Sequence, residues 1–412
     1  MTTSVSRTID AIWKIEAAKI IGGLARVVRD VGIAEDLAQD ALIAALEQWP
    51  VKGIPPNPGA WLSATARNKA IDRIRRDVNF RRKLEILGHE LDEAAPAGDP
   101  PEVIQDDVLR LIFTACHPIL SHEAQIALTL RIVCGLTIEE IARAQIVPEP
   151  TVQQRIVRAK KKLSDVGVKF SDIAPEELAT RLGAVLQVIY LIYNEGYSAS
   201  SGADYLRLSL CEEALRLGRM LAALVRDDGE VWALLALMEL QASRARARTD
   251  AHGTPVSLPD QNRALWDRLQ IMRGLKALDT SRALGGPAGT YYVQASIAAC
   301  HARAVEASAT DWPQISALYS LLADMTGSPV VRLNHAVAAG MAYGPAAGLQ
   351  LLAPLWEEPA LKGYHPLWAA HGELLFRAGR KGEAKVAFET AAGMTKNAPE
   401  RRALQMRADG CL

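Results

Sequence analysis

The stretch GLTIEEIARAQIVPEPTVQQRIVRAKKKL, residues 135–163, gives the clearest indication of how this chain folds. Thr137 is suited to cap a short helix, because Glu140 follows three residues later and completes a capping box. Pro150 and Thr151 then suit the first turn of a second helix. Two short helices joined by a tight turn predict a helix-turn-helix.

The second of these helices has an apolar face and a basic face. Helical spacing predicts a buried stripe that consists of Val152, Ile156, Ala159 and Leu163. From Thr151 to Lys162 the chain has five basic residues and no acid. Arginine and glutamine suit the base edges of DNA, whereas a lysine run suits phosphates. The candidate DNA-binding residues are Thr151, Gln153, Gln154, Arg155, Arg158, Lys160, Lys161 and Lys162. The alternative is a solvated face of an ordinary helical bundle.

Upstream, residues 9–83 are predicted to form packed helices. Apolar residues recur there in two stripes, on either side of a break at Gly32. The first stripe contains Ile20, Leu24, Val27, Val28 and Val31, and the second contains Leu37, Ala41, Leu42 and Ala45. On the opposite, solvated face of the second helix we expect Glu35, Asp36, Gln39 and Asp40. Alone, this pattern is typical of any surface helix.

A second basic block runs from Arg67 to Lys83, where eight basic residues stand against two acids. Trp61 precedes it, and an aromatic ring beside positive charge suits binding to unpaired bases. A tryptophan at helical spacing is also a common core residue. The candidate nucleic-acid-binding residues here are Trp61, Arg67, Asn68, Lys69, Asp72, Arg73, Arg75 and Arg76.

The rest of the chain is divided by an acidic segment at residues 84–108, which has eight acids and no Lys or Arg. Its sequence AAPAGDPP, residues 94–101, cannot continue a helix and predicts a linker. Helical periodicity returns at 109–168. A new helix is expected to open at Pro175, and residues 175–412 are predicted to be all-helical.

The C-terminal part contains one segment with the spacing of a tetratricopeptide repeat. Its small and aromatic positions are Trp368, Gly372, Gly379, Ala384, Phe388 and Ala391, although His371 and Leu375 depart from the usual pattern. We expect an array of helical hairpins. An unrelated helical bundle is the alternative.

In this order, the acidic helix, the aromatic-basic block and the helix-turn-helix resemble the extracytoplasmic-function RNA polymerase sigma factors over residues 10–168. The resemblance implies an all-α fold, with sigma region 2 as a helical bundle at 8–83, a flexible acidic linker at 84–108 and sigma region 4 at 109–168. It implies that Glu35, Asp36, Gln39 and Asp40 dock on the clamp helices of core RNA polymerase, which also binds the chain through its flap.

The resemblance further implies that the Trp61 to Arg76 segment opens DNA and captures the minus-ten element. The helix-turn-helix would read the minus-thirty-five element, and the linker would thread the polymerase cleft. Promoter DNA and core polymerase are thus the expected partners.

Residues 190–198 and 244–266 resemble the subgroup of these sigma factors that carries a tetratricopeptide-like C-terminal extension. Polar-tipped aromatic residues suit an inter-domain seam, and the candidates are Tyr190, Tyr193, Asn194, Glu195 and Tyr197. A plain core helix is the alternative. We interpret Arg244, Arg246 and Arg248 as a solvated helix end. A regulatory protein or ligand is expected to act on the extension, at residues 175–412.

Composition limits which other classes of protein this chain can belong to. Formal net charge is zero, so any nucleic-acid signal is local. The five cysteines, at 116, 134, 211, 300 and 411, lack the spacing of a zinc finger and predict reduced thiols. The apolar run at 182–193 is too short to span a membrane. We expect a cytoplasmic, nucleoid-associated protein without cofactor or metal.

Three other functions are compatible with parts of the sequence. An enzyme is disfavoured because no phosphate loop, metal spacing or nucleophile motif occurs. A helix-turn-helix repressor or activator with a sensing domain is the main alternative, but it needs neither the acidic docking helix nor the aromatic-basic block. A helical-repeat adaptor would explain only residues 175–412.

Overall fold

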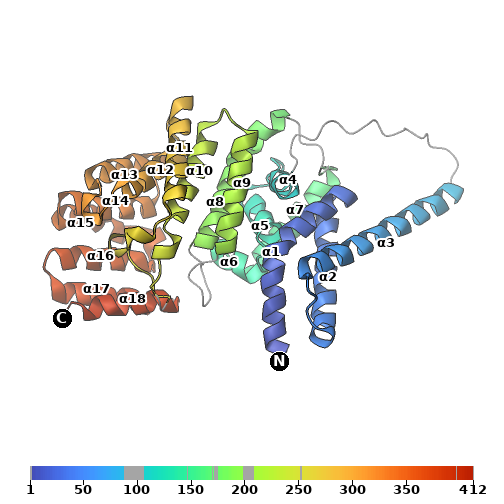
Figure 1. The fold of residues 1–412 in the computed structure, drawn as a ribbon, viewed down its shortest axis with the longest axis horizontal. Helices are drawn as coiled ribbons and strands as arrows, with labels where there is room; N and C mark the ends of the chain where they lie inside the picture. The colour runs from blue at the N-terminus through green and yellow to red at the C-terminus, as the bar shows by residue number, and fades with distance from the viewer. Residues whose placement is uncertain are drawn as a thin grey trace. The chain divides into compact units, whose positions relative to one another are not determined.

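The computed structural model describes residues 2–87, 106–145, 147–168, 170, 175–197, 208–250, 253–395 and 397–411, with side chains of the third helix described as far as Arg76. Within these ranges the chain is helical and contains no β-strand, which confirms the predicted all-α fold. The chain divides into two compact units, Met1–Ile192 and Tyr193–Leu412 (Figure 1). The central part of the predicted linker, 88–105, lies outside the described residues.

The N-terminal unit holds the first seven helices and most of the eighth. They are α1 (Thr2–Val28), α2 (Val31–Lys52), α3 (Pro58–Leu87), α4 (Asp107–Ala115), α5 (His122–Ile132), α6 (Ile138–Gln145), α7 (Glu149–Asp165) and α8 (Pro175–Tyr197). Helices α1, α2 and α3 pack on one another around Ile21, Leu37 and Leu62. Both α1 and α2 also contact the later helices, since α1 packs on α4 and α2 on α7.

The break between α1 and α2 lies earlier than the sequence predicted. Asp30 caps α2 by accepting a hydrogen bond from the backbone N–H of Ile33 over 2.8 Å, and Arg29 adopts a left-handed φ of 57°. The predicted break at Gly32 is therefore wrong, because α1 ends at Val28, before the left-handed Arg29, and Asp30 caps the start of α2. The assignment of Val27 to the first apolar stripe is also wrong, because its side chain is 48% exposed.

Helices α6 and α7 form the predicted helix-turn-helix. The capping box is confirmed, since Thr137 N–H donates to Glu140 and Glu140 N–H donates to the Thr137 hydroxyl, over 2.9 and 3.1 Å. Pro150 lies in the first turn of α7. The predicted buried stripe is confirmed in full, because the buried residues of α7 are Val152, Ile156, Ala159 and Leu163.

Helix α8 begins at Pro175, as the sequence predicts. Its first half contributes to the N-terminal unit. Arg181, 2% exposed, donates from Nη1 to the carbonyl oxygen of Phe113 over 3.1 Å. Phe170, just before α8, is 1% exposed, and the guanidinium of Arg110 lies 5.4 Å from its ring centre.

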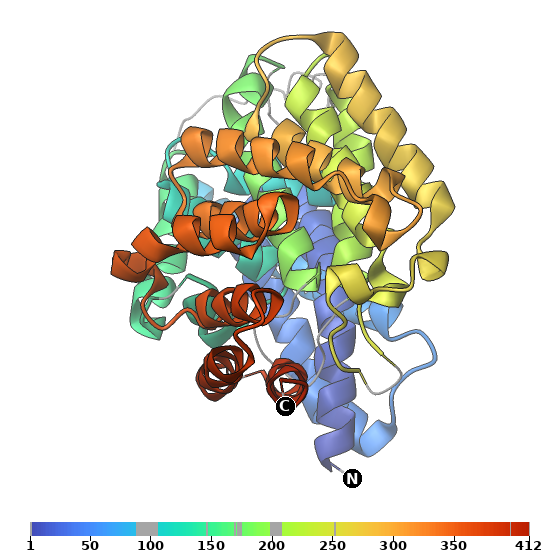
Figure 2. The same cartoon turned by 90° about the vertical axis from the view of Figure 1, so that its left-hand side faces the viewer.

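The C-terminal unit is a helical array. Its α-helices are α9 (Leu208–Leu224), α10 (Gly229–Ala242), α11 (Arg268–Leu284), α12 (Thr290–Arg303), α13 (Trp312–Thr326), α14 (Pro329–Tyr343), α15 (Pro345–Leu352), α16 (His365–Arg377), α17 (Lys381–Met394) and α18 (Ala398–Asp409). Short 3-10 helices are η1 (Ala245–Ala247), η2 (Leu258–Asp260), η3 (Arg263–Leu265), η4 (Ala307–Ala309), η5 (Ala353–Glu357) and η6 (Pro359–Leu361). From α13 to α18 each helix packs on the next, which Figures 1 and 2 show as stacked layers.

The segment with tetratricopeptide spacing is the hairpin of α16 and α17. A Cβ at Gly372 would lie 3.0 Å from the Phe388 ring, so glycine lets the two helices approach. Gly379, with φ of 76°, forms the turn between them. Small residues serve other pairs in the same way, because a Cβ at Gly348 would lie 2.7 Å from the Ala336 carbonyl oxygen.

Candidate polymerase and nucleic-acid interfaces

Helix α2 divides its polar residues between two faces. Asp36 and Asp40 are exposed and stand one turn apart, so they lie on the same face. Glu35 is only 2% exposed, and the half-buried Gln39 donates from Nε2 to Glu35 Oε1 over 2.5 Å. The prediction of one solvated face for all four residues is therefore wrong for Glu35.

Buried Glu35 is neutralised by basic side chains from later helices. Arg131 of α5 donates from Nε to Glu35 Oε1 over 3.1 Å. Lys160 of α7 forms an ion pair with Glu35 Oε2, and its Nζ lies 3.5 Å from Asp36 Oδ1. A carboxylate in such a position needs partners, because an unpaired buried charge is costly. The structure thus joins a predicted polymerase-binding residue to a predicted DNA-binding residue.

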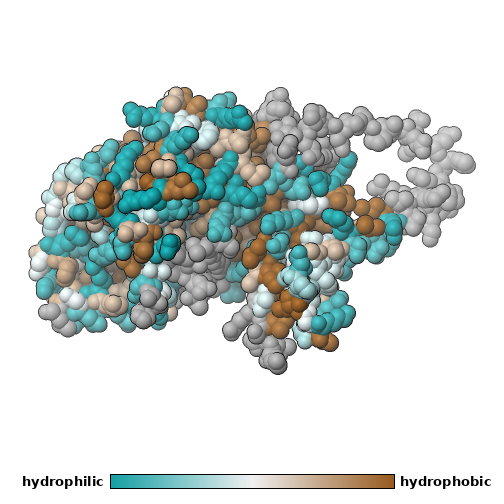
Figure 3. All heavy atoms as spheres, in the orientation of Figure 1, coloured by the Kyte–Doolittle hydropathy of each residue, from teal (hydrophilic) through white to brown (hydrophobic). Residues whose placement is uncertain are grey.

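The exposed stripe of α2 consists of Asp36, Asp40, Ile43 and Glu47, at steps of four, three and four residues. Ile43 is 51% exposed, and Figure 3 shows hydrophobic residues gathered over α1 and α2. Sequence reasoning missed Ile43 and Glu47, although continuing the helical step from Asp40 would have found them. An apolar side chain flanked by acids on a solvated helix is suited to bind another protein.

The basic helix α3 leaves the bundle after Ala70. Every described residue from Ile71 to Arg76 is exposed, around the whole circumference of the helix. Arg67 and Asn68 are exposed as well, while Lys69 Nζ lies 3.7 Å from Asp40 Oδ2. Of the predicted residues, Arg67, Asn68, Asp72, Arg73, Arg75 and Arg76 are thus accessible to a partner.

Trp61 is half-buried. Its ring meets that of Trp49 edge to face, with 5.4 Å between centroids, and Trp49 is 2% exposed. One side of Trp61 therefore contributes to the core, as the alternative interpretation allowed. Trp61 lies on α3 itself, six residues before Arg67.

Helix α7 presents its basic face beyond the buried stripe. Gln154, Arg158 and Lys161 are exposed at steps of four and three residues, and Gln153 and Lys162 are exposed beside them. Thr151, Arg155 and Lys160 are half-buried. Lys162 Nζ donates to the carbonyl oxygen of Ile119 over 2.6 Å.

The candidate seam residues Tyr193 and Tyr197 pack inside the C-terminal unit. Their rings stack with centroids 5.5 Å apart, and burial raises the pKa of the Tyr193 hydroxyl well above its usual value. Arg244 donates to the Tyr197 hydroxyl over 2.8 Å, and the Arg248 guanidinium lies 3.5 Å above the Tyr197 ring. The interpretation of Arg248 as part of a solvated helix end is therefore wrong, because its side chain is 8% exposed. The other candidates, Tyr190, Asn194 and Glu195, are half-buried. A role at a seam stays a prediction.

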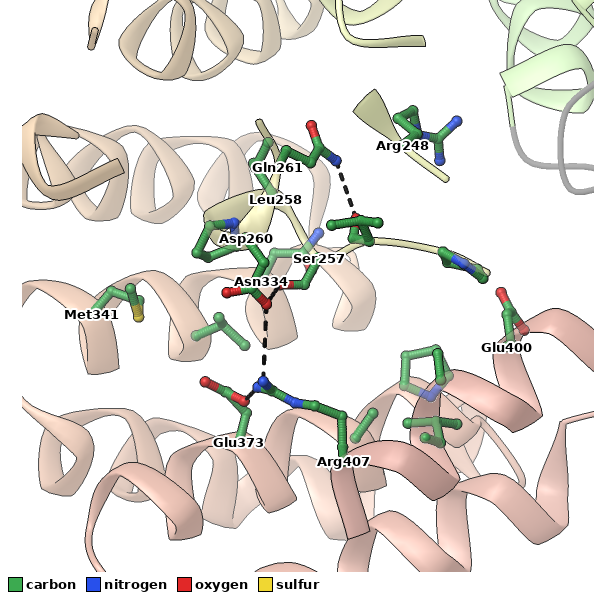
Figure 4. A pocket seen from close by; sticks show the side chains of 18 of the residues that line it. Arg248, Ser257, Leu258, Asp260, Gln261, Asn334, Met341, Glu373, Glu400 and Arg407 are labelled. Carbon is green, nitrogen blue, oxygen red and sulfur yellow. Dashed lines mark hydrogen bonds and ion pairs between the residues drawn. The ribbon is translucent and has the colours of Figure 1, made fainter. Parts of the chain in front are cut away.

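A cavity of about 1000 Å³ lies within the C-terminal unit. Figure 4 shows the segment containing Ser257 and Asp260 on one side of it, facing Glu373 and Arg407. Arg407 pairs with Glu373 and has Nη1 3.9 Å from Asp260 Oδ2, so it links the two sides.

Apolar side chains make up much of the cavity wall, among them Trp312, Tyr319, Phe376 and Phe388. His301 also lines it, and burial lowers the pKa of its ring to about 3, so the ring is neutral. An apolar cavity of this size with a few polar groups has the form of a small-molecule site.

All five cysteines are free, buried thiols, as predicted, and burial raises the pKa of Cys116 to about 12. The described residues contain no group of three or more side chains suited to hold a metal. In the same ranges, no helix is both long enough and apolar enough to cross a membrane.

Comparison with known proteins gives relatives of two kinds. An uncharacterized protein of Rhizobium meliloti is 42% identical over 394 residues, which cover 94% of this chain and 92% of the relative. The probable extracytoplasmic-function RNA polymerase sigma factor SigI of Mycobacterium tuberculosis is 26% identical over 177 residues, 42% of this chain and 60% of SigI. SigL, an extracytoplasmic-function RNA polymerase sigma factor of the same organism, is 29% identical over 163 residues, 38% of this chain and 90% of SigL. No solved structure matches the chain.

Family models match three segments. Residues 16–79 match sigma-70 region 2, residues 110–163 match sigma-70 region 4, and residues 181–282 match a family of unknown function, DUF6596. The two sigma regions imply core RNA polymerase and promoter DNA as partners, and the non-catalytic nature of sigma factors fits a chain that is not an enzyme. The chain belongs to the extracytoplasmic-function RNA polymerase sigma factors and carries a helical C-terminal extension.

Proposed function

We propose that this sigma factor docks on the clamp helices of polymerase through the exposed stripe of α2. The observation that carries the proposal is the alignment of Asp36, Asp40, Ile43 and Glu47 on one solvated face. Acids give orientation and a fast encounter with a basic partner, while a desolvated isoleucine adds affinity. Glu35 and Gln39 border this stripe and join the interface when polymerase binds. The flap contact is assigned to residues 109–168.

Promoter DNA contacts α3 and α7 in this proposal. The exposed arginines of α3, on the same helix as the half-buried Trp61, suit the unpaired strand of the minus-ten element. On α7, Gln154 and Arg155 are assigned to base edges of the minus-thirty-five element, and Lys161 and Lys162 to phosphates. Because its partners are polymerase and the chromosome, the protein is expected to act in the cytoplasm, at the nucleoid.

The extension is proposed to regulate these contacts in response to a ligand or protein. The cavity of about 1000 Å³ in the C-terminal unit supports this assignment, because its wall combines apolar side chains with the charged pair of Glu373 and Arg407, as small-molecule sites do. A bound ligand that favours one conformation shifts the population towards it.

In-vitro transcription with purified core polymerase tests the proposal. The intact chain is expected to initiate at a defined set of promoters from a mixed library, which is read by sequencing the transcript ends. A variant with Asp36→Lys and Asp40→Lys should lose this activity. The matched control reverses two exposed acids elsewhere, Asp10→Lys and Asp227→Lys, and should keep it. Equal loss in both variants would contradict the assignment of α2.

A further inference from the structure

The charged side chains that line the cavity of the C-terminal unit lie at two sides of it. At one side, Arg377 Nε donates to Glu373 Oε1 over 2.7 Å, and Arg407 pairs with the same carboxylate. Arg407 Nη1 also lies 3.9 Å from Asp260 Oδ2. Both arginines at this side therefore have a carboxylate partner, and a charged ligand would have to displace it.

Arg244 lines the cavity as well, but its charge is not balanced in this way. Its Nη2 donates to the Tyr197 hydroxyl over 2.8 Å, and its guanidinium lies 5.9 Å from the centre of the Trp266 ring. Both partners are neutral, and within the described residues no carboxylate forms an ion pair with Arg244. A guanidinium has several N–H donors, of which Tyr197 takes one, so charge and donors remain for a ligand.

The aromatic residues around Arg244 fix its position. The Tyr197 hydroxyl that accepts its hydrogen bond belongs to a ring that stacks on Tyr193, with 5.5 Å between centroids. The Arg248 guanidinium lies 3.5 Å from the centre of the Tyr197 ring and donates to the Tyr197 carbonyl oxygen. A side chain that is held in place before binding loses little conformational entropy when a ligand binds.

The ring of His301 indicates the sign of the electrostatic field at this side of the cavity. Burial is the main cause that lowers the pKa of the ring to about 3, and the two electrostatic causes are the positive charges of Arg244 and Arg263. A region that disfavours an added proton favours an anion. Figure 4 shows Arg248 well apart from Glu373 and Arg407, so the basic side is separate from the side with paired charges.

The cavity wall beside these arginines is aromatic and apolar. Trp312 meets the His301 ring edge to face at 5.3 Å, and Tyr319 follows about two turns later on the same face of α13. Val337 of α14 also lines the cavity. The wall thus offers an apolar surface next to a cation that lacks a counter-ion.

We propose that this cavity binds an amphipathic organic acid, which places its carboxylate on Arg244 and its apolar body against Trp312 and Tyr319. A neutral apolar molecule would leave the Arg244 charge unmatched, and a small inorganic anion would leave the aromatic wall uncovered. Hydrogen bonds from arginine to a carboxylate are stronger than those between neutral groups, and burial of the apolar body adds to them. This acid would be the ligand to which the extension responds, so its regulatory effect rests on the proposed function.

Three aromatic probes of similar size test the site in the intact chain by isothermal titration calorimetry. Naphthylacetate has an anionic head, naphthylacetamide a neutral head and naphthylethylamine a cationic head. Naphthylacetate should bind one site with a Kd below about 1 mM. Naphthylacetamide should bind at least about tenfold more weakly, because it lacks the charge-assisted bond to Arg244, and naphthylethylamine should not bind.

Matched variants locate the site. Arg244→Gln should weaken the binding of naphthylacetate by about tenfold and leave that of naphthylacetamide unchanged. Arg246→Gln, at an exposed arginine of η1, is the control and should change neither. Val337→Trp fills part of the cavity and should abolish the binding of both probes, whereas Val386→Trp, at a position of α17 that is 60% exposed, should not.

Equal affinity of the parent chain for all three heads would overturn the anionic assignment, and a lack of binding by every probe would overturn the site. Retained binding in Val337→Trp would show that the probe binds outside the cavity and would overturn the site too. If Arg244→Gln fails to fold, the three probes on the parent chain and on Val337→Trp still decide the outcome.

Transcription separates the binding site from its regulatory role. Run-off transcription by the holoenzyme should change by more than about twofold with saturating naphthylacetate relative to naphthylacetamide, and Val337→Trp should remove this difference. Binding of naphthylacetate without a change in transcription would support the site and overturn the proposed ligand regulation by the extension.

Discussion

Acid should destabilise the C-terminal unit through one buried histidine, His301. Its side chain is on α12 and is 8% exposed. Burial is the main cause that lowers the pKa of the ring, from 6.5 to about 3, and the nearby Arg244 and Arg263 guanidiniums lower it further. The ring also meets Trp312 edge to face at 5.3 Å, and its Nδ1 has no hydrogen-bond partner among the described residues.

The sign of the effect follows from proton uptake. Between about pH 3 and 6.5 the unfolded chain binds a proton at His301 and the folded chain does not. The folded state therefore pays no penalty for the neutral His301 ring above pH 6.5, and its stability decreases as the pH falls below that value. Each pH unit in this window changes the free energy of unfolding by about 1.4 kcal/mol. The free energy of unfolding should therefore be about 2 kcal/mol lower at pH 5.0 than above pH 6.5.

Urea unfolding at pH 7.5 and pH 5.0, followed by circular dichroism, measures this loss. His301→Gln should reduce the difference between the two pH values by about 2 kcal/mol, because glutamine does not titrate. His122→Gln is the control, since His122 is exposed on α5 and should leave the difference intact. The reasoning would be refuted by a His301→Gln variant that loses as much stability on acidification as the parent chain.

Three further outcomes are expected. The double variant Asp36→Lys, Asp40→Lys should not bind core polymerase in a pull-down. Its circular dichroism should stay unchanged, because exposed substitutions usually alter stability by under about 0.5 kcal/mol. Retained binding would contradict the assignment of the α2 stripe to polymerase. Arg155→Ala should reduce the binding free energy by roughly 1 to 3 kcal/mol at one promoter position. Lys161→Ala should weaken binding to all promoters and lower the slope of log affinity against log salt concentration by about one. Both effects are measured with holoenzyme on promoter variants at two salt concentrations. If Arg155→Ala weakened every sequence equally, its base-reading role would be wrong. Arg263→Met should lower the free energy of unfolding by roughly 3 kcal/mol in urea, because Arg263 donates to the His301 and Ala304 carbonyls at 2.7 Å and to the Thr310 hydroxyl at 3.0 Å; a loss under about 1 kcal/mol would contradict it.

Local patterns predicted the helix-turn-helix well. The capping box of Thr137 and Glu140 and the buried stripe of α7 depend on residues three or four positions apart, so the sequence contains all the partners. The misplaced break at Gly32 shows the limit of residue type alone. The left-handed Arg29 follows the end of α1, and the side chain of Asp30 caps the start of α2, so the break lies before the glycine.

Long-range partners could not be predicted. Glu35 resembles its neighbour Asp36 in the sequence, but Arg131 and Lys160 bury it from positions about a hundred residues away. Arg248 likewise looks like a surface residue until the ring of Tyr197 packs beneath it. Helical spacing in the sequence predicts on which face of a helix a residue lies. Which other helices pack on that face can be known only from the three-dimensional structure.

The placement of α8 constrains how such a chain can be assembled or taken apart in evolution. Phe170 and Arg181 lie after the DNA-reading helix, yet they complete the core around Phe113 and Arg110. A recombination event just after α7 would therefore leave region 4 with an exposed apolar surface and an unpaired carbonyl. Chimeras that exchange extensions between sigma factors should place their junction beyond Ile192, so that the first half of α8 is inherited with the region it completes.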